Sequence, residues 1–166
     1  MWIDRIVELQ RGKHCVAIKN VSLAEEHLHD HFPATDHYPA TPVMPASLMI
    51  EGMAQTAGIL TGHARDFTEK VILAKIGKAT FSEDVTPGQT IRYLATLERI
   101  DESGASTSGT VQVIEPWHEK PTPRTIGQID LMFSHIDNNR SGLDFPEHNF
   151  VFTDQFMNLM RNSGVE

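Results

Sequence analysis

The stretch from Ala46 to Ala64 constrains the fold of this chain most strongly. It reads ASLMIEGMAQTAGILTGHA, contains no proline, and would place apolar side chains on nearly every face of a helix. A helix that is apolar all round is buried in a core, because it keeps no polar side for water. The stretch is too short for a membrane span and carries Glu51 and Gln55. The rest of the chain must therefore wrap around this helix.

Strand patterns rich in Val, Ile, Thr, Leu and Phe lie on both sides of the helical stretch. They cover residues 2–9, 14–21, 71–81, 89–100, 105–115 and 125–136. Turn-forming residues separate the strands, and the short connections among the last four predict an antiparallel meander. We predict an α+β fold in which a long buried central helix is wrapped by a six-stranded antiparallel sheet.

The length of 166 residues suits one domain with a single core. We expect that domain to occupy residues 1–137 and a C-terminal extension to occupy residues 138–166. Within the extension, residues 153–161 have the spacing of a short amphipathic helix. Two interpretations of this helix stay open: it packs on the domain surface, or it serves as a lid or dimer element.

Charge and cysteine content narrow the classes of function. Lys and Arg number 14 and Asp and Glu number 22, which gives a net charge of −8. An acidic chain without a basic run is a poor nucleic-acid binder, so we expect no nucleic-acid partner. The single Cys15 excludes an intramolecular disulfide and a zinc cluster built from cysteines. We see neither a signal peptide nor a membrane segment, and we expect a soluble, cytoplasmic protein.

Glu51 is the unexpected residue of the apolar stretch. Its sequence neighbours are mostly apolar, and an ionised carboxylate buried among them costs several kcal/mol unless it is partnered. We therefore predict a shielded carboxyl with a role in proton transfer rather than a solvent-facing glutamate. Gln55 lies one turn later on the same helix face and is placed to hold this carboxyl by a hydrogen bond.

The segment before the helix is rich in histidine. Four histidines (His27, His29, His31 and His37) fall within eleven positions, and His31-Phe-Pro-Ala-Thr-Asp is followed directly by the near-repeat His37-Tyr-Pro-Ala-Thr-Pro. Their spacing lacks the i, i+4 order and third ligand of a helical zinc motif, so we predict no metal site. A histidine base, a helix carboxyl and the free N–H groups at the helix start would together form an acid/base site with an oxyanion hole.

The segment PATPVMPASLMIEGMAQTAGIL resembles the active-site segment of the 3-hydroxyacyl-[acyl-carrier-protein] dehydratases of the FabZ type, whose pattern reads H-F-P-G-x-P-V-M-P-G-V-L-x-x-E-A-M-A-Q. Further similar segments, from DRIVEL near the start to IDLMFSHID, follow in the expected order over residues 2–136. The resemblance implies the hot-dog fold and removal of water from a 3-hydroxyacyl thioester, which gives a trans-2-enoyl thioester in fatty-acid or related lipid biosynthesis.

Residue roles follow from this resemblance. In that family a histidine takes the C2 proton, a carboxyl handles the departing hydroxyl, and the two come from opposite protomers of a dimer. Glu51 matches the carboxyl, and the backbone N–H of Ala46 matches the oxyanion donor. The family usually has glycine at that position, and alanine keeps the N–H. Counting forward from the upstream strand at the family spacing favours His31 as the base, whereas counting back from Glu51 favours His37. A six-residue insertion that nearly duplicates its neighbour would explain both matches.

The resemblance also implies partners. We expect an acyl carrier protein bearing a 3-hydroxyacyl chain, a homodimer that pairs strands edge to edge, and possibly a trimer of dimers. No cofactor is implied, because dehydration involves no redox step. An acyl tunnel could be lined by apolar residues that are equally core candidates, namely Met49, Met53, Ile59, Leu60 and Phe81. Two other functions stay open: a hot-dog acyl thioesterase, and a non-catalytic acyl-binding subunit.

Overall fold

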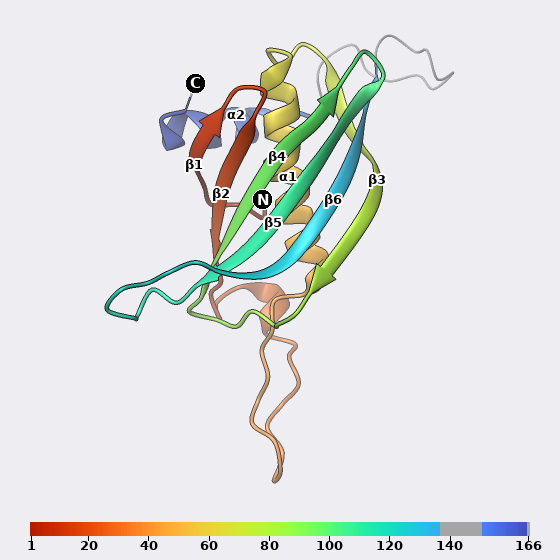
Figure 1. Cartoon of the computed structure of the whole chain (residues 1–166). Coiled ribbons are helices and arrows are strands. Elements are labelled where there is room, and N and C mark those ends of the chain that lie inside the picture. Colours follow the sequence, from red (N-terminus) through yellow and green to blue (C-terminus); the bar gives the residue numbers. More distant parts are fainter. Residues whose placement is uncertain (137–150, 166) are drawn as a thin grey trace.

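The computed structural model describes residues 1–136 and 151–165, and its centre is one long helix lying against a six-stranded sheet (Figure 1). The strands are β1 (Arg5–Gln10), β2 (His14–Asn20), β3 (Lys70–Phe81), β4 (Thr90–Ile100), β5 (Gly104–Ile114) and β6 (Arg124–Ile136). The helices are the 3₁₀ turn η1 (Glu26–Leu28), α1 (Ala46–Ala64) and α2 (Asp154–Ser163). This is the predicted α+β hot-dog arrangement.

All neighbouring strands of the sheet are antiparallel, in the order β1-β2-β4-β5-β6-β3. The prediction of a meander through the last four strands is correct for β4, β5 and β6 but wrong for β3, which lies at the sheet edge beside β6. Burial explains the difference. In β4 the side chains of Ile91, Tyr93 and Ala95 alternate toward the core, as a central strand requires, whereas residues 74–80 of β3 are exposed on both faces.

Helix α1 packs one face against the sheet (Figure 1). Met49, Met53 and Leu60 are buried in the core. The helix approaches β4 closely at Gly52, where a Cβ would lie 2.5 Å from the Cζ and hydroxyl of Tyr93. The opposite face is not buried over the first turns of α1, where Ala46, Ser47 and Glu51 are exposed and none of the described residues covers them. The expectation of a helix buried all round is therefore wrong for its N-terminal half.

Helix α2 packs against β1 at the other edge of the sheet (Figure 1). Its own Leu159 and Met160 are buried. The Oγ of Ser163 accepts a 3.0 Å hydrogen bond from the backbone N–H of Ile6. Because this contact uses an N–H of β1, the C-terminal helix covers an edge that would otherwise be open, and the β3 edge has no such cover among the described residues.

The single cysteine is part of the core of the sheet. Cys15 lies in β2 between Leu9 of β1 and Ala95 of β4, and its side chain is fully buried. This burial raises the pKa of the Cys15 thiol to about 12, because the thiolate would lose its hydration. In the part of the chain that the structure describes, no helix is long and apolar enough to cross a membrane.

Candidate active site

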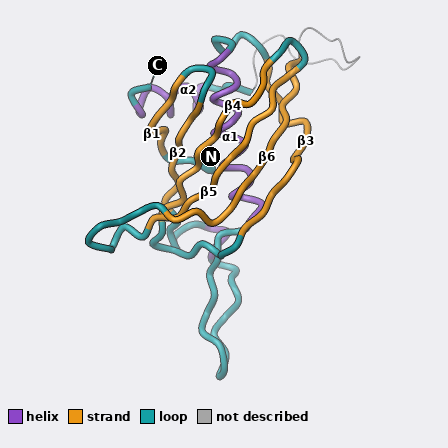
Figure 2. The backbone as a smooth tube through the Cα atoms, viewed as in Figure 1, coloured by secondary structure: helices purple, strands orange, loops and turns teal. Residues whose placement is uncertain are grey.

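The histidine-rich segment forms a long loop that projects away from the body of the protein, between η1 and α1 (Figure 2). At its base the N–H of Thr41 donates to the carbonyl of Phe32 at 3.0 Å, and near its tip the N–H of Thr35 donates to the carbonyl of Tyr38 at 2.8 Å. Phe32 and Tyr38 are 77% and 72% exposed.

The two candidate histidines occupy different parts of this loop. His37 lies beside the tip and is exposed. His31 lies at the base, half-buried, with its Nδ1 2.7 Å from the carbonyl oxygen of Leu28. A carbonyl only accepts, so Nδ1 carries the proton and the neutral ring keeps its lone pair on Nε2. This arrangement leaves His31 ready to accept a proton at Nε2.

Glu51 is held by a chain of two hydrogen bonds. The Oε1 of Gln55 accepts the backbone N–H of Trp2 at 2.9 Å, which directs the amide nitrogen of Gln55 the other way, where it donates to Oε1 of Glu51 at 2.9 Å. The expected Gln55–Glu51 contact is therefore confirmed. Trp2 was not anticipated, since 53 positions separate it from Gln55 and no sequence pattern links them.

In the described part of the chain, Glu51 has no hydrogen bond or ion pair with either candidate histidine, His31 or His37. The prediction that Glu51 is shielded from water is also wrong for the isolated chain, since its side chain is exposed. Its apolar neighbours Met49 and Met53 do not shield it because they are buried in the core, while Glu51 lies on the exposed side of α1.

The first turn of α1 begins at Ala46, directly after Pro45. No side chain caps this end, and within residues 1–136 and 151–165 the backbone N–H of Ala46 has no hydrogen-bond acceptor. Ala46 itself is exposed. A free, accessible N–H at a helix start can donate to a carbonyl oxygen or an anion, which is the geometry that an oxyanion site needs.

An apolar cavity of about 200 Å³ runs along α1 from Glu51. Its floor on α1 includes Ala54, Gly58 and Ile59. The sheet and the C-terminal segment supply the other walls, namely Val71, Leu73, Phe133, Val151, Phe152 and Phe156. Of the residues expected to line an acyl tunnel, only Ile59 lines this cavity. Met49, Met53 and Leu60 belong to the core, so they point to the sheet instead.

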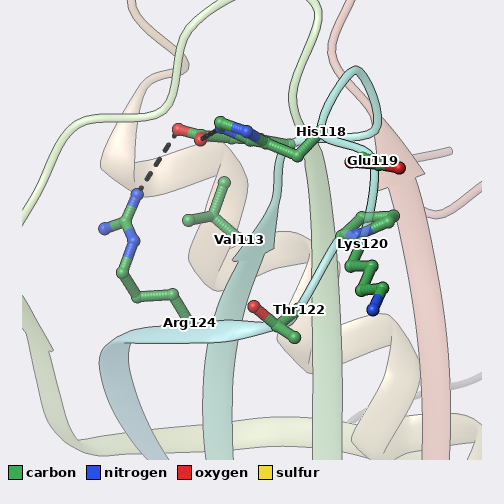
Figure 3. A pocket seen from close by; sticks show the side chains of 8 residues that line it. Val113, His118, Glu119, Lys120, Thr122 and Arg124 are labelled. Carbon is green, nitrogen blue, oxygen red and sulfur yellow. Dashed lines mark hydrogen bonds and ion pairs between the residues drawn. The ribbon is translucent and has the colours of Figure 1, made fainter.

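A second pocket of about 530 Å³ lies at the connection between β5 and β6 (Figure 3). Its lining is mostly polar: Glu115 pairs with His118 at 2.7 Å and with Arg124 at 3.6 Å, and Lys120 lies nearby. The His118 contact is the first cause of a lowered pKa at Glu115. None of the predicted site residues lines this pocket. In the described part of the chain, no three His, Cys, Asp or Glu side chains gather as a set of metal ligands.

Comparisons with known proteins now identify the family. The FabA-like domain matches residues 1–114. The chain belongs to the FabA-like domain family. A relative from Caldanaerobacter subterraneus subsp. tengcongensis, named 3-hydroxyacyl-[acyl-carrier-protein] dehydratase FabZ, is 34% identical over 116 residues, which cover 69% of this chain and 78% of that protein. A protein of the same name from Methylobacterium radiotolerans is 43% identical over 97 residues, covering 56% and 58%.

The match to several of these FabA-like relatives is partial. For five relatives named FabZ, this chain spans between 55% and 64% of the relative's length. Solved structures support the hot-dog fold. A chain of the dehydratase heterocomplex ApeI:P from Xenorhabdus doucetiae has a TM-score of 0.62 at 15% identity and covers 85% of this chain and 86% of that one. A mutant acyl-CoA hydrolase from Staphylococcus aureus has a TM-score of 0.57 at 14% identity, with 81% and 71% covered.

Proposed function

We propose that this chain removes water from a 3-hydroxyacyl thioester carried by an acyl carrier protein, giving a trans-2-enoyl thioester. One observation carries the proposal. The exposed Glu51 is held by Gln55 at one end of an apolar cavity. The hydroxyl-bearing part of the substrate would lie at Glu51, and the apolar acyl chain would lie in the cavity beside it. The relatives named as dehydratases of this kind support the same reaction.

The reaction assigns one task to each group. The base takes the C2 proton, and the electron pair of that C–H bond forms the C2–C3 double bond. The C3–O bond breaks, and the carboxyl of Glu51 gives its proton to the departing hydroxyl, which leaves as water. The free N–H of Ala46 donates to the thioester oxygen, where negative charge develops. The Nδ1–Leu28 contact supports His31 as the base, because Nε2 is then the accepting atom.

We propose that the complete site forms in a homodimer. In one chain the histidine loop projects into solvent and Glu51 is exposed, so each half of the site is available to a second copy (Figure 2). The β3 edge supports strand pairing between copies, because β3 has twelve residues, is exposed on both faces over residues 74–80, and presents Ile76 at 46% exposure. A trimer of dimers and a cytoplasmic location remain part of the proposal.

The test follows the ultraviolet absorbance of the conjugated enoyl product. The unmodified protein should produce it from a 3-hydroxyacyl thioester, and Glu51→Gln should lower turnover by about two to four orders of magnitude while the circular dichroism spectrum stays unchanged. Near-normal turnover in that variant would remove Glu51 from the mechanism. A thioesterase would instead release free thiol, and a binding subunit would yield neither product. Light scattering at micromolar concentration should show a dimer or larger species, and a monomer would contradict a shared site.

A further inference from the structure

The C-terminal segment, which lies beyond the FabA-like match over residues 1–114, forms one wall of the apolar cavity. Val151, Phe152 and Phe156 line it together with Gly58 and Ile59 of α1. The same segment continues into α2, which is anchored on β1 through Ser163. The wall is therefore fixed to the body of the domain at the far end of α2.

The direction of the cavity follows from helix geometry. Glu51, Gln55, Gly58 and Gly62 are spaced by four, seven and eleven residues and lie on one face of α1. At 1.5 Å per residue, Gly58 lies about 10 Å and Gly62 about 16 Å along the axis from Glu51. Gly62 does not line the cavity itself, but it lies one turn beyond Gly58, on the side farther from the carboxyl.

Phe152 lines the cavity and its ring lies against Gly62, which places the ring at this far side. A side chain at Gly62 would overlap the Phe152 ring, so the absence of a Cβ there makes the seat for this ring. The ring also packs edge-to-face on Phe67, with ring centroids 4.8 Å apart, and lies 6.2 Å from the ring of Phe156. Held on these sides, the partly buried Phe152 ring acts as a fixed stop, because moving it would cost these aromatic contacts.

We propose that Phe152 sets the longest acyl chain that the site accepts, and that the C-terminal segment is in this way a specificity element of the enzyme. The inference rests on the proposed function, since it takes the cavity beside Glu51 as the acyl site. The far end of the cavity is apolar, so its ligand is the terminal methyl and methylene groups of a short acyl chain. Longer chains meet the Phe152 ring.

The experiment compares variants on 3-hydroxyacyl pantetheine thioesters of four and of ten carbons. Phe152→Ala lengthens the cavity, and Gly58→Leu fills it from the α1 side, where a Cβ would have only the Phe133 ring within 4 Å, at 3.9 Å. Met157→Ala is the matched control, because Met157 lies on α2 beside Phe156 but lines a different pocket. If Phe152→Ala fails to fold, Phe152→Leu repeats the test, because leucine keeps a smaller apolar side chain at this position.

We expect the ratio of kcat/KM for the ten-carbon over the four-carbon substrate to rise about 16-fold in Phe152→Ala. Each newly buried methylene strengthens binding about fourfold, and removing the ring makes room for about two. The ratio should fall in Gly58→Leu and stay unchanged in Met157→Ala. An equal ratio in Phe152→Ala and Met157→Ala would overturn the inference and leave the proposed function standing.

A second measurement tests the chain-length role of Phe152 separately from the proposed dehydratase function. Affinities for saturated acyl-pantetheine thioesters of four to ten carbons are measured by calorimetry for the same variants. Should the unmodified protein turn over no substrate, the proposed function fails. The inference then depends on this binding series: a preference that moves to longer chains in Phe152→Ala supports it, and an unchanged preference refutes it.

Discussion

Two glycines of α1 offer a matched comparison of how tightly the helix bearing Glu51 lies on the sheet. Gly52 and Gly58 are both interior positions of the same helix, so replacement by alanine gives each the same intrinsic gain of about 1 kcal/mol in helix propensity. They differ in packing. A Cβ at Gly52 would lie 2.5 Å from the Cζ and hydroxyl of Tyr93, whereas a Cβ at Gly58 would lie 3.9 Å from the Phe133 ring.

The magnitude follows from these distances. The distance from a Cβ at Gly52 to Tyr93 is about 1 Å shorter than an ordinary van der Waals contact. The Tyr93 ring is rigid and fully buried, so it cannot move aside. Overpacking of a core costs up to about 3 kcal/mol. Subtracting the propensity gain, we expect Gly52→Ala to lower the free energy of unfolding by about 2 kcal/mol. Gly58→Ala meets no clash and should raise it by up to about 1 kcal/mol.

Thermal unfolding followed by circular dichroism measures the difference. A gap of about 3 kcal/mol corresponds to Tm values separated by about 6–12 °C in a protein of this size. Both variants must be compared at one protein concentration, because association shifts Tm. In addition, Gly52→Ala should reduce turnover, since lifting α1 by about 1 Å displaces the neighbouring Glu51. Equal stabilisation by both substitutions would refute the close approach of α1 to β4.

Two further predictions concern the loop and a turn. His31→Ala should reduce turnover by about 10²–10⁴-fold and His37→Ala by less than tenfold, and equal mild losses measured in the enoyl absorbance assay would exclude both as the base. Hydrogen bonds from Ser103 lower the pKa of Asp101 to about 2 from an ordinary 3.8, so this carboxylate stabilises the fold above pH 4 and stops doing so as pH falls through 2. Asp101→Ala should lower Tm at pH 7 and match the unmodified protein near pH 2, and a gap that persists at pH 2 would contradict the assignment.

Local patterns were enough to predict most of the fold. The six strands and α1 lie within a few residues of their predicted positions, because alternation and an apolar helical run are encoded in consecutive residues. The place of β3 was predicted wrongly. A short connection after this strand suggested that it pairs with β4, whereas it pairs with β6 at the sheet edge. Sequence spacing located Gln55 beside Glu51 for the same local reason.

Long-range contacts account for what the sequence could not predict about the candidate site. Nothing in the sequence pairs Trp2 with Gln55 or seats Phe152 on Gly62, because these residues meet only after the chain has folded. The exposure of Glu51 was missed for a related reason. The sequence shows that the neighbours of Glu51 are mostly apolar. Which face of α1 contacts the sheet is determined only by how the helix packs.

The buried thiol makes the protein a convenient subject for site-specific labelling. Cys15 is the one cysteine in the sequence, has no exposed surface and has a pKa near 12, so at neutral pH it offers almost no thiolate to a maleimide or iodoacetamide dye. A cysteine introduced in place of the exposed Tyr38 would therefore carry the label alone, without prior removal of a native thiol. The emission of a fluorophore at that position would change if the projecting loop became buried against another surface.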